Sequence, residues 1–245
     1  MCIKMPRPIG RRAVSCGAVG ANRYTHYQFT TIEIGSAYAY GINNLGLVSG
    51  FYIDNDGNYD GFLWLCGAAE ANVDARGWPD TLLGGGNDAG VIAGNYGDLT
   101  VSHATLYHAR EQTWAPLPDI SGKPMNFGNG INDEGIAGGA AFEGNLDVFT
   151  NGVAWIWDGC AYSFFEAPAA SGPVFGTLAA GINNLGQVCG YYADSEGVAH
   201  GFLKKGPSIT TIDVPGADAT FATSINNRGD IAGNYPIVAA ASRKS

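Results

Sequence analysis

The sequence predicts a single all-β domain in which five copies of one repeat form a five-bladed β-propeller. Three observations predict this fold. A four-residue motif, Asn-Asn/Asp-x-Gly, occurs five times at intervals of 44, 45, 51 and 43 residues. Segments of strand length with alternating apolar residues flank each copy. The two ends of the chain supply complementary parts of one repeat. Repeats of about 45 residues with four short antiparallel strands are typical of propeller blades.

The repeated motif predicts a tight turn between two strands. Asn or Asp bonds the local backbone, and the glycine takes the left-handed conformation that other residues resist. A second glycine follows the first Asn by seven residues in every copy, and a tyrosine follows it by nine in four copies. We assign both to the framework, because a residue repeated in nearly every blade serves a repeated packing role. The motifs are residues 43–46, 87–90, 132–135, 183–186 and 226–229, the second glycines are Gly50, Gly94, Gly139, Gly190 and Gly233, and the tyrosines are Tyr52, Tyr96, Tyr192 and Tyr235.

Each repeat is expected to contain four strands. The first ends at the motif, the second starts after it, and the third and fourth follow. The expected first strands are 37–42, 81–86, 126–131, 177–182 and 220–225, and the second are 47–53, 91–97, 136–142, 187–193 and 230–236. Third strands are expected at 61–64, 103–106, 153–156 and 201–203, and the clearest fourth strand at 209–213.

The chain ends predict how the ring closes. The fifth repeat stops soon after Tyr235, whereas FTTIE at 29–33 copies ITTID at 209–213. An N-terminal strand that completes the last blade would remove an exposed sheet edge. The third strand of that blade is either 12–17 or 236–241. An open solenoid is the structural alternative, but it would need polar caps. The predicted domain organisation is an N-terminal segment at 1–23, strand-forming or partly flexible, one propeller at 24–240, and a tail at 241–245.

Composition excludes several classes of partner. The formal charge is −9, with 13 Lys and Arg, and there is no basic run outside the extreme N-terminus. We therefore expect no nucleic-acid partner, because binding to a phosphate backbone depends on cationic side chains. No stretch approaches 18 consecutive apolar residues, so no membrane-spanning helix is expected. The oligomeric state is left open.

The compartment and the cysteine pairing are also left open. The N-terminus is basic, but its apolar part at 13–21 is short and rich in glycine, which makes it a weak secretory signal. The cysteines are odd in number and show no CxxC spacing, so neither a zinc site nor a disulfide framework can be inferred from them. They are Cys2, Cys16, Cys66, Cys160 and Cys189.

The strand before each motif is the expected source of a binding site. In a propeller the innermost strands converge on the axis, and we place these strands there. One face carries small residues that suit close approach to the next blade, whereas the other face varies between repeats. Variable positions that combine aromatic and polar groups suit an apolar small molecule. The alternative is that they only pack between blades. The candidate substrate-binding residues are Tyr38, Tyr40, Phe127, Asn129, Phe221 and Thr223.

Other residues that could carry chemistry have simpler interpretations. His103 and His200 occupy equivalent positions and are expected to be structural, while His26 and His108 lack a partner at a known triad spacing. The segment 54–60 has oxygen-bearing side chains at alternate positions, but its glycine is misplaced for an EF-hand and no Glu closes it. A solvated turn is the favoured interpretation, and calcium binding there is left open. We therefore predict no metal and no cofactor, and we assign no catalytic residue.

The repeats resemble those of a known family, and we illustrate the resemblance with one repeat. The run GINNLGQVCGYY at 181–192, followed by HGFL at 200–203, resembles the "extracellular repeat, HAF family" segments of bacterial and fungal proteins. The resemblance covers most of the chain and concerns turn and packing positions. Small fungal proteins with this type of repeat look like the hetero-Diels–Alderases of tropolone sesquiterpenoid biosynthesis. No catalytic motif of those enzymes is matched here.

The resemblance implies a cofactor-independent enzyme of natural-product assembly. Such an enzyme would join a tropolone- or polyketide-derived quinone methide to a terpene in an axial pocket, mainly by positioning the two reactants. A non-catalytic, secreted ligand- or glycan-binding propeller is the alternative, and a hydrolase or lyase with scattered carboxylates ranks third. Near-identical sites on every blade would favour the binding protein.

Overall fold

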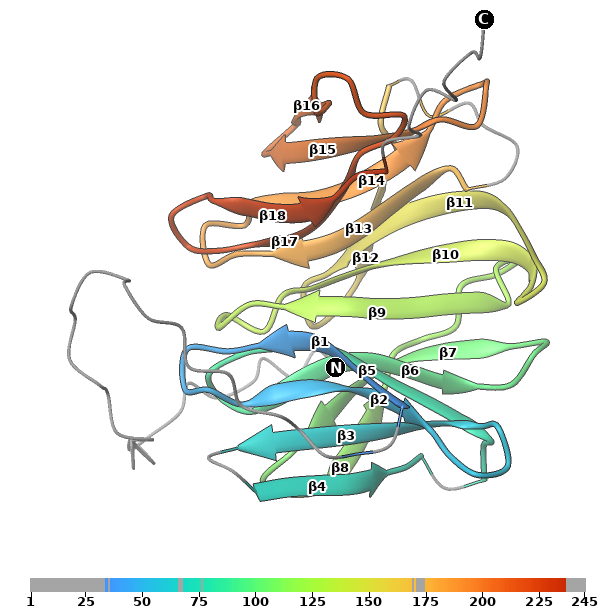
Figure 1. Cartoon of the computed structure of the whole chain (residues 1–245), viewed down its shortest axis with the longest axis vertical. Helices are drawn as coiled ribbons and strands as arrows, with labels where there is room; N and C mark the ends of the chain where they lie inside the picture. Colours follow the sequence, from blue (N-terminus) through green and yellow to red (C-terminus); the bar gives the residue numbers. More distant parts are fainter. Residues whose placement is uncertain are drawn as a thin grey trace, which may run out of the picture.

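The computed structural model describes residues 34, 36–65, 68–75, 77–168, 170 and 175–236. The expected N-terminal segment 1–23, the strand at 29–33 and the tail 241–245 lie outside these residues. So do both alternatives for the third strand of the last blade, 12–17 and 236–241, except for Pro236. The described residues form 18 strands and no helix, which confirms the all-β prediction (Figure 1).

The strands follow the repeats in order. Repeat 1 contains β1 (Ser36–Ile42), β2 (Val48–Ile53), β3 (Tyr59–Leu65) and β4 (Ala68–Val73), and repeat 2 contains β5 (Asp80–Gly86), β6 (Val91–Gly97), β7 (Ser102–His108) and β8 (Thr113–Pro116). Repeat 3 contains β9 (Met125–Ile131), β10 (Ala137–Asn145), β11 (Val148–Trp157) and β12 (Tyr162–Phe165). Repeat 4 contains β13 (Thr177–Ile182), β14 (Val188–Ala193), β15 (Ala199–Lys205) and β16 (Ser208–Ile212), and repeat 5 contains β17 (Phe221–Ile225) and β18 (Ile231–Asn234).

Each of the first four repeats is a four-stranded antiparallel meander, as expected. One parallel bridge, Ser102 to Met125, joins the sheets of repeats 2 and 3 into a single eight-stranded sheet. The longest interval between motifs, 51 residues, separates those of repeats 3 and 4. It includes the long β10–β11 hairpin of repeat 3, whose strands have nine and ten residues. In every repeat the strand before the motif is the first strand of the meander and pairs with only one strand of its own repeat, and we call it the inner strand. Inner strands β5, β9, β13 and β17 pack against the sheet of the preceding repeat.

The second glycine of each repeat is required by close backbone packing. A Cβ on Gly139 would lie 2.0 Å from the Phe127 carbonyl oxygen and 2.3 Å from the Trp155 ring. The other four have the same neighbour, a carbonyl oxygen of their own inner strand, at 2.0 to 2.5 Å. Because a backbone oxygen cannot yield to a methyl group, glycine is found in all five copies.

The buried apolar residues form clusters shared by adjacent repeats. One cluster packs Val91 and Leu106 of repeat 2 against Ile131 and Trp155 of repeat 3. Another packs Ala154 of repeat 3 against repeat 4. This nearest-neighbour arrangement is typical of repeat proteins, in which one repeat cannot bury its apolar face alone.

The Asn-Asn/Asp-x-Gly motif forms the predicted turn. Gly135 N–H donates to the Asn132 carbonyl at 3.1 Å, and the motif glycines have φ between 68° and 87°. The first Asn also organises the turn through its side chain. Asn132 Oδ1 accepts from the backbone N–H groups of Glu134 and Ile136 at 3.1 and 3.0 Å, and the other copies show the same two bonds.

The turns are also hydrogen-bonded to one another in a row that we call the turn ladder. In repeats 1 to 4 the first Asn donates through Nδ2 to the carbonyl of the first Asn in the next repeat. The steps are Asn43 to Asn87 at 2.8 Å, Asn87 to Asn132 at 3.0 Å, Asn132 to Asn183 at 3.1 Å and Asn183 to Asn226 at 2.9 Å. Among the described residues no step returns from Asn226 to Asn43. Only an amide offers this donor together with the turn acceptor, so this position is Asn in every copy.

A second row of bonds explains why the next position is either Asn or Asp. The backbone N–H of that residue donates to the side-chain oxygen of its counterpart in the following repeat. The four bonds run from Asn44 to Asp88, from Asp88 to Asp133, from Asp133 to Asn184 and from Asn184 to Asn227, at 2.8 to 3.0 Å. This role needs only an acceptor, which both residue types supply.

Candidate functional site

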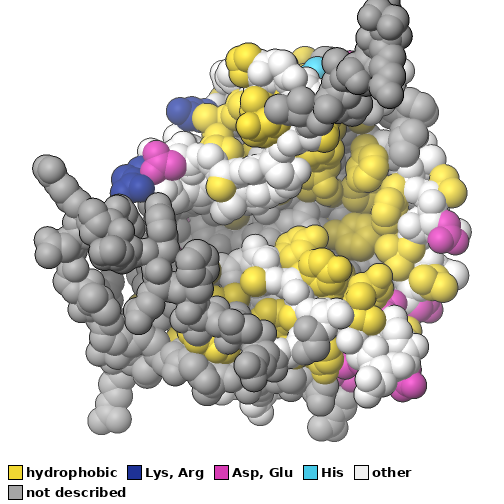
Figure 2. Space-filling view, viewed as in Figure 1, with side chains coloured by type: hydrophobic (Ala, Val, Ile, Leu, Met, Phe, Trp, Pro, Cys, Tyr) yellow, Lys and Arg dark blue, Asp and Glu magenta, His cyan; other side chains and the backbone are white. Residues whose placement is uncertain are grey.

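The inner strands of all five repeats line one cavity. Its volume is about 450 Å³, and β1, β5, β9, β13 and β17 all contribute to its wall. A second cavity of about 350 Å³ adjoins it at the turn ladder and shares Ile131, Ile182 and Ile225 with it. We call the first the central cavity. Figure 2 shows a hollowed face with hydrophobic side chains gathered beside the hollow.

A β-bulge in each inner strand determines which side chains enter the central cavity. In β1, Ala39 pairs with Gly50 and Gly41 pairs with Ser49, so Tyr40 is the extra residue. The same register shift occurs in the inner hairpin of every repeat. Bulges re-aim side chains and are enriched beside binding sites. The residues at this position, which we call the bulge layer, are Tyr40, Gly84, Asn129, Ala180 and Thr223.

The bulge layer separates the candidate residues into two groups. Tyr40, Asn129 and Thr223 line the central cavity together. Tyr38, Phe127 and Phe221, two positions earlier, are not part of this lining and pack against other rings, and the Tyr40 ring also lies 5.5 Å from Phe51. The ring centroids are 5.1 Å apart for Tyr38 and Phe51, 5.9 Å for Phe127 and Phe142, and 5.0 Å for Phe221 and Tyr191.

Repeats 2 and 4 contribute little side-chain volume to the bulge layer. A Cβ on Gly84 would lie 2.6 Å from the Asn129 carbonyl oxygen, so repeat 2 has no room for a side chain there. Ala180 lines the cavity with a methyl group. Burial raises the pKa of Tyr191 in repeat 4, and the Tyr40 phenol raises it further.

Two polar groups of the bulge layer are bonded to the framework. Asn129 Nδ2 donates to the Ala179 carbonyl of the next repeat at 2.8 Å, and the Thr223 hydroxyl donates to the Ala232 carbonyl at 3.3 Å. The Tyr40 side chain is largely exposed, and no hydrogen bond of its hydroxyl is found among the described residues. Apart from the Tyr40 phenol, no titratable side chain of the described part of the chain lines the cavity.

The only described free cysteine is not a nucleophile in its folded environment. Cys189 is fully buried against Ala222 and Ile225, and burial raises the pKa of its thiol to about 12. The thiol therefore stays protonated near neutral pH. The arrangement in the central cavity can position a ligand and hydrogen-bond to it, but its described lining holds no side chain suited to covalent attack.

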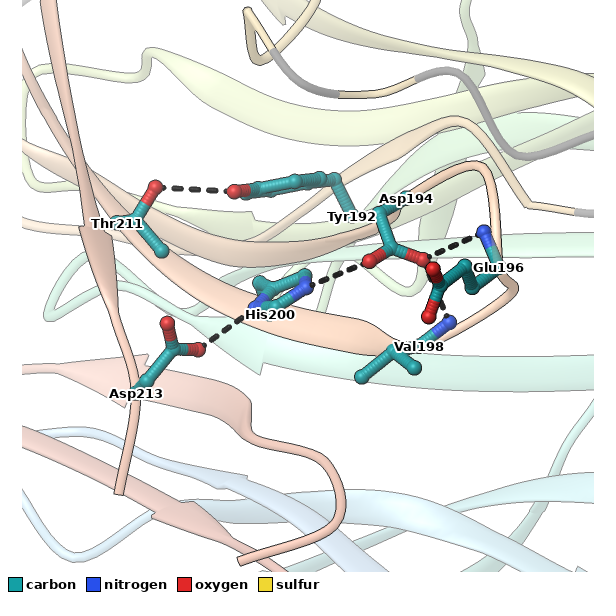
Figure 3. A network of polar contacts seen from close by, with 7 residues as sticks. All are labelled: Tyr192, Asp194, Glu196, Val198, His200, Thr211 and Asp213. Atoms are coloured by element: carbon teal, nitrogen blue, oxygen red, sulfur yellow. Dashed lines mark hydrogen bonds and ion pairs between the residues drawn. The ribbon is translucent and has the colours of Figure 1, made fainter. Parts of the chain in front are cut away.

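The histidines expected to be structural belong to cross-strand polar networks outside the cavity. His200 bonds Asp213 Oδ1 through Nδ1 at 2.8 Å and Asp194 Oδ2 through Nε2 at 3.2 Å, and it stacks on Tyr192 (Figure 3). Hydrogen bonds to Asp213 and Asp194 raise the pKa of His200. The equivalent residue of repeat 2, His103, pairs across the strands with Tyr96 and bonds Asp119 at 2.7 Å. The tyrosine nine residues after the motif thus has a repeated partner on the third strand.

The segment 54–60 forms a turn held by one carboxylate. Asp54 Oδ1 accepts from the N–H groups of Asp56 and Asn58, both at 2.8 Å, and the Asn58 bond is the main reason why the pKa of Asp54 is lowered. Asp98 and Asp194, at the equivalent position, hold their turns in the same way. Within the described part of the chain, no three His, Cys, Asp or Glu side chains are arranged to hold a metal ion.

Two structural features were not anticipated from the sequence. The sequence signal of the turn ladder is that the first motif position is always Asn, whereas the second is Asn or Asp. The sequence signal of the bulge layer is a residue of any size between two small residues before each motif. The clearest examples are Ala39-Tyr40-Gly41, Gly128-Asn129-Gly130, Ala179-Ala180-Gly181 and Ala222-Thr223-Ser224.

No protein-family model matches the chain, and no curated protein matches it significantly. Among the described residues, no helix has the length and hydropathy needed to cross a membrane.

Proposed function

We propose that the five repeats form a closed five-bladed β-propeller whose central cavity binds apolar small molecules and guides a cofactor-independent hetero-Diels–Alder cycloaddition. One observation carries the proposal. The motif Asn and the two glycines recur in every repeat, whereas the bulge layer differs in all five, and four of its five residues line a single cavity. A repeat protein with one variable, shared cavity is suited to one ligand assembly per chain.

Closure of the ring would complete repeat 5 with the N-terminal strand. β18 is the last described strand of a two-stranded sheet, whereas the other repeats have four. The sequence at 29–33 copies 209–213, and most of that segment is β16, the outer strand of repeat 4. We expect removal of residues 1–33 to lower the melting temperature strongly and removal of residues 1–23 to change it little. Equal effects in a thermal melt would contradict this mode of closure.

The reaction class comes from the resemblance to the hetero-Diels–Alderases, and the cavity is compatible with it. The C=C–C=O unit of a quinone methide would combine with a C=C bond of a terpene, forming one C–C and one C–O bond with no atom lost and no oxidant needed. Holding the two partners in reactive geometry can lower a barrier by about 7 to 11 kcal/mol in favourable cases. The Tyr40 hydroxyl would stabilise charge that develops on the carbonyl oxygen.

The proposal is tested by supplying the reactants. A quinone methide released from a tropolone precursor is incubated with a cyclic sesquiterpene, with and without the protein. We expect the protein to increase the rate of adduct formation and to give one stereoisomer, measured by chiral liquid chromatography with mass spectrometry. A racemic adduct at the background rate would contradict catalysis. Several equivalent ligands bound per chain in a co-crystal would favour the glycan-binding alternative.

A further inference from the structure

The hydrogen-bonding groups of the bulge layer restrict the chemistry of the ligand. The Asn129 amide already donates to Ala179, which leaves its oxygen as an acceptor. The Thr223 hydroxyl donates to Ala232, which leaves the lone pairs of its oxygen. No described residue donates a hydrogen bond to Asn129 Oδ1 or Thr223 Oγ1. Repeats 3 and 5 thus offer acceptors to a bound molecule.

The remaining polar side chains of the cavity do not remove the need for hydrogen-bond donors on the ligand. The hydroxyls of Tyr40 and Ser224 can each donate or accept, and both line the cavity. One N–H of Asn129 is the only further side-chain donor of the bulge layer. A ligand that could only accept hydrogen bonds would leave both fixed acceptors unpaired when it excluded water, and an unpaired buried polar group is costly.

The charge of the ligand is restricted as well. Among the described residues no acid, base or histidine lines the central cavity, so an ion placed there would find no opposite charge on its described wall. The adjoining cavity at the turn ladder includes Asp88 and Asp133 in its wall. These carboxylates repel an anion at that end, and the formal charge of the chain is −9.

We propose that the central cavity selects a neutral ligand bearing hydroxyl groups that donate to Asn129 Oδ1 and Thr223 Oγ1. Tyr40 and the Ala180 methyl group bound the same cavity from repeats 1 and 4. This inference rests on the proposed function of the cavity as a ligand site and specifies which ligands the site prefers. Asn129 and Thr223 are then specificity-determining residues rather than catalytic ones.

The test compares three fluorescent probes of similar shape on the full chain. Naphthalene-2,3-diol can donate two hydrogen bonds, its dimethyl ether can only accept them, and 3-hydroxy-2-naphthoate is an anion. Dissociation constants are measured by fluorescence titration. We expect the diol to bind at least about tenfold more tightly than the ether, because two hydrogen bonds separate them, and the anion to bind most weakly. Equal affinity of diol and ether would overturn the inference.

Thr223→Val removes one acceptor and keeps the shape of the side chain. We expect the preference for the diol over the ether to fall to about threefold, and Thr210→Val on β16 to leave it unchanged. An unchanged preference in a folded Thr223→Val variant would overturn the inference. If the diol does not bind but the cycloaddition is accelerated, the inference alone fails. If neither is seen, the inference and the proposed function both fail.

Discussion

The turn ladder, just after each inner strand, and the bulge layer, within the strand, differ in which residues are the same in every repeat. At the turn ladder, the first Asn of every repeat makes the same two turn bonds, and four of the five also connect their repeat to the next. Three residues earlier, the bulge layer holds Tyr, Gly, Asn, Ala and Thr at equivalent positions. The backbone geometry is shared at both places, but only the ladder uses its side chains for the framework in every repeat. We therefore assign stability to the ladder position and ligand choice to the bulge position three residues earlier. Substitutions at the two positions test whether these roles are separate.

The largest expected effect comes from Asn132→Ala at the centre of the ladder. Asn132 is buried, and its side chain makes three hydrogen bonds, two within its turn and one to Asn183. Their loss leaves buried polar groups unpaired and should cost about 2 to 4 kcal/mol of unfolding free energy. Asn129→Ala removes one framework bond and should cost about 1 kcal/mol. Denaturant unfolding of both variants checks the difference, and equal losses would break the distinction between ladder and bulge layer.

A smaller effect isolates the donor that only an amide provides. Asn132→Asp keeps the turn acceptor but loses the bond to Asn183, so we expect a loss of about 1 to 2 kcal/mol. Asn227→Asp keeps the one bond described for that side chain, the acceptor bond from Asn184 N–H, and should be neutral within about 0.5 kcal/mol. Chemical denaturation near neutral pH measures both. A stable Asn132→Asp variant would show that the ladder donor contributes nothing.

The bulge layer should tolerate changes that the ladder does not. Ala180→Phe places a ring in the central cavity, and we expect a change in unfolding free energy of less than about 1.5 kcal/mol, because the ring enters space rather than packed core. Binding of naphthalene-2,3-diol should be lost. Leu185→Phe, on an exposed turn of the same repeat, is the matched control and should leave binding intact. Retained binding in Ala180→Phe would place the ligand elsewhere.

The smallest effect lies outside both regions and depends on pH. The pKa of His200 is raised in the folded protein, so its charged pairs with Asp213 and Asp194 stabilise the fold fully below the ordinary histidine pKa. That stabilisation is lost as pH rises through the higher folded value. We expect the melting temperature of His200→Gln to be slightly below that of the unaltered protein at pH 5 and equal to it at pH 9. Binding in the central cavity should not follow this trend, and a melting difference independent of pH would contradict the pairing.

Much of the fold could be predicted because its signals repeat. Glycine at the left-handed turn position and at the crowded position of the second strand is required for local reasons, so motif and strand order were readable in the chain. The ladder could not be inferred in the same way, because it joins residues 43 to 51 positions apart whose registry depends on how the repeats pack. The repeated Asn is explained equally well by its bonds within the turn, so its presence alone does not reveal the bond to the next repeat.

The candidate site was predicted only in part, and the reason lies in the bulge. Simple alternation puts Tyr38 and Tyr40, or Phe127 and Asn129, on the same face of a strand. The register shift at Asn129 separates that pair, so that Asn129 lines the cavity and Phe127 packs on neighbouring rings. Tyr40 also lines the cavity, but its ring packs on Phe51 as the Tyr38 ring does. A bulge depends on the pairing of two strands, and a count of alternate residues along one strand does not reveal it.

The direction of the turn ladder also bears on how the protein is made. Every step donates from an earlier repeat to a later one, so the amide of each turn finds its partner only in sequence that is synthesised about 45 residues afterwards. During synthesis from the N-terminus, the newest turn would always have an unpaired donor, and each arriving repeat would pair it. At the last turn, the Asn226 amide donates to Asp230 of its own repeat at 2.9 Å. Asn183 makes the corresponding bond to Gln187 and the ladder step as well, whereas the last described turn keeps only the bond within its own repeat.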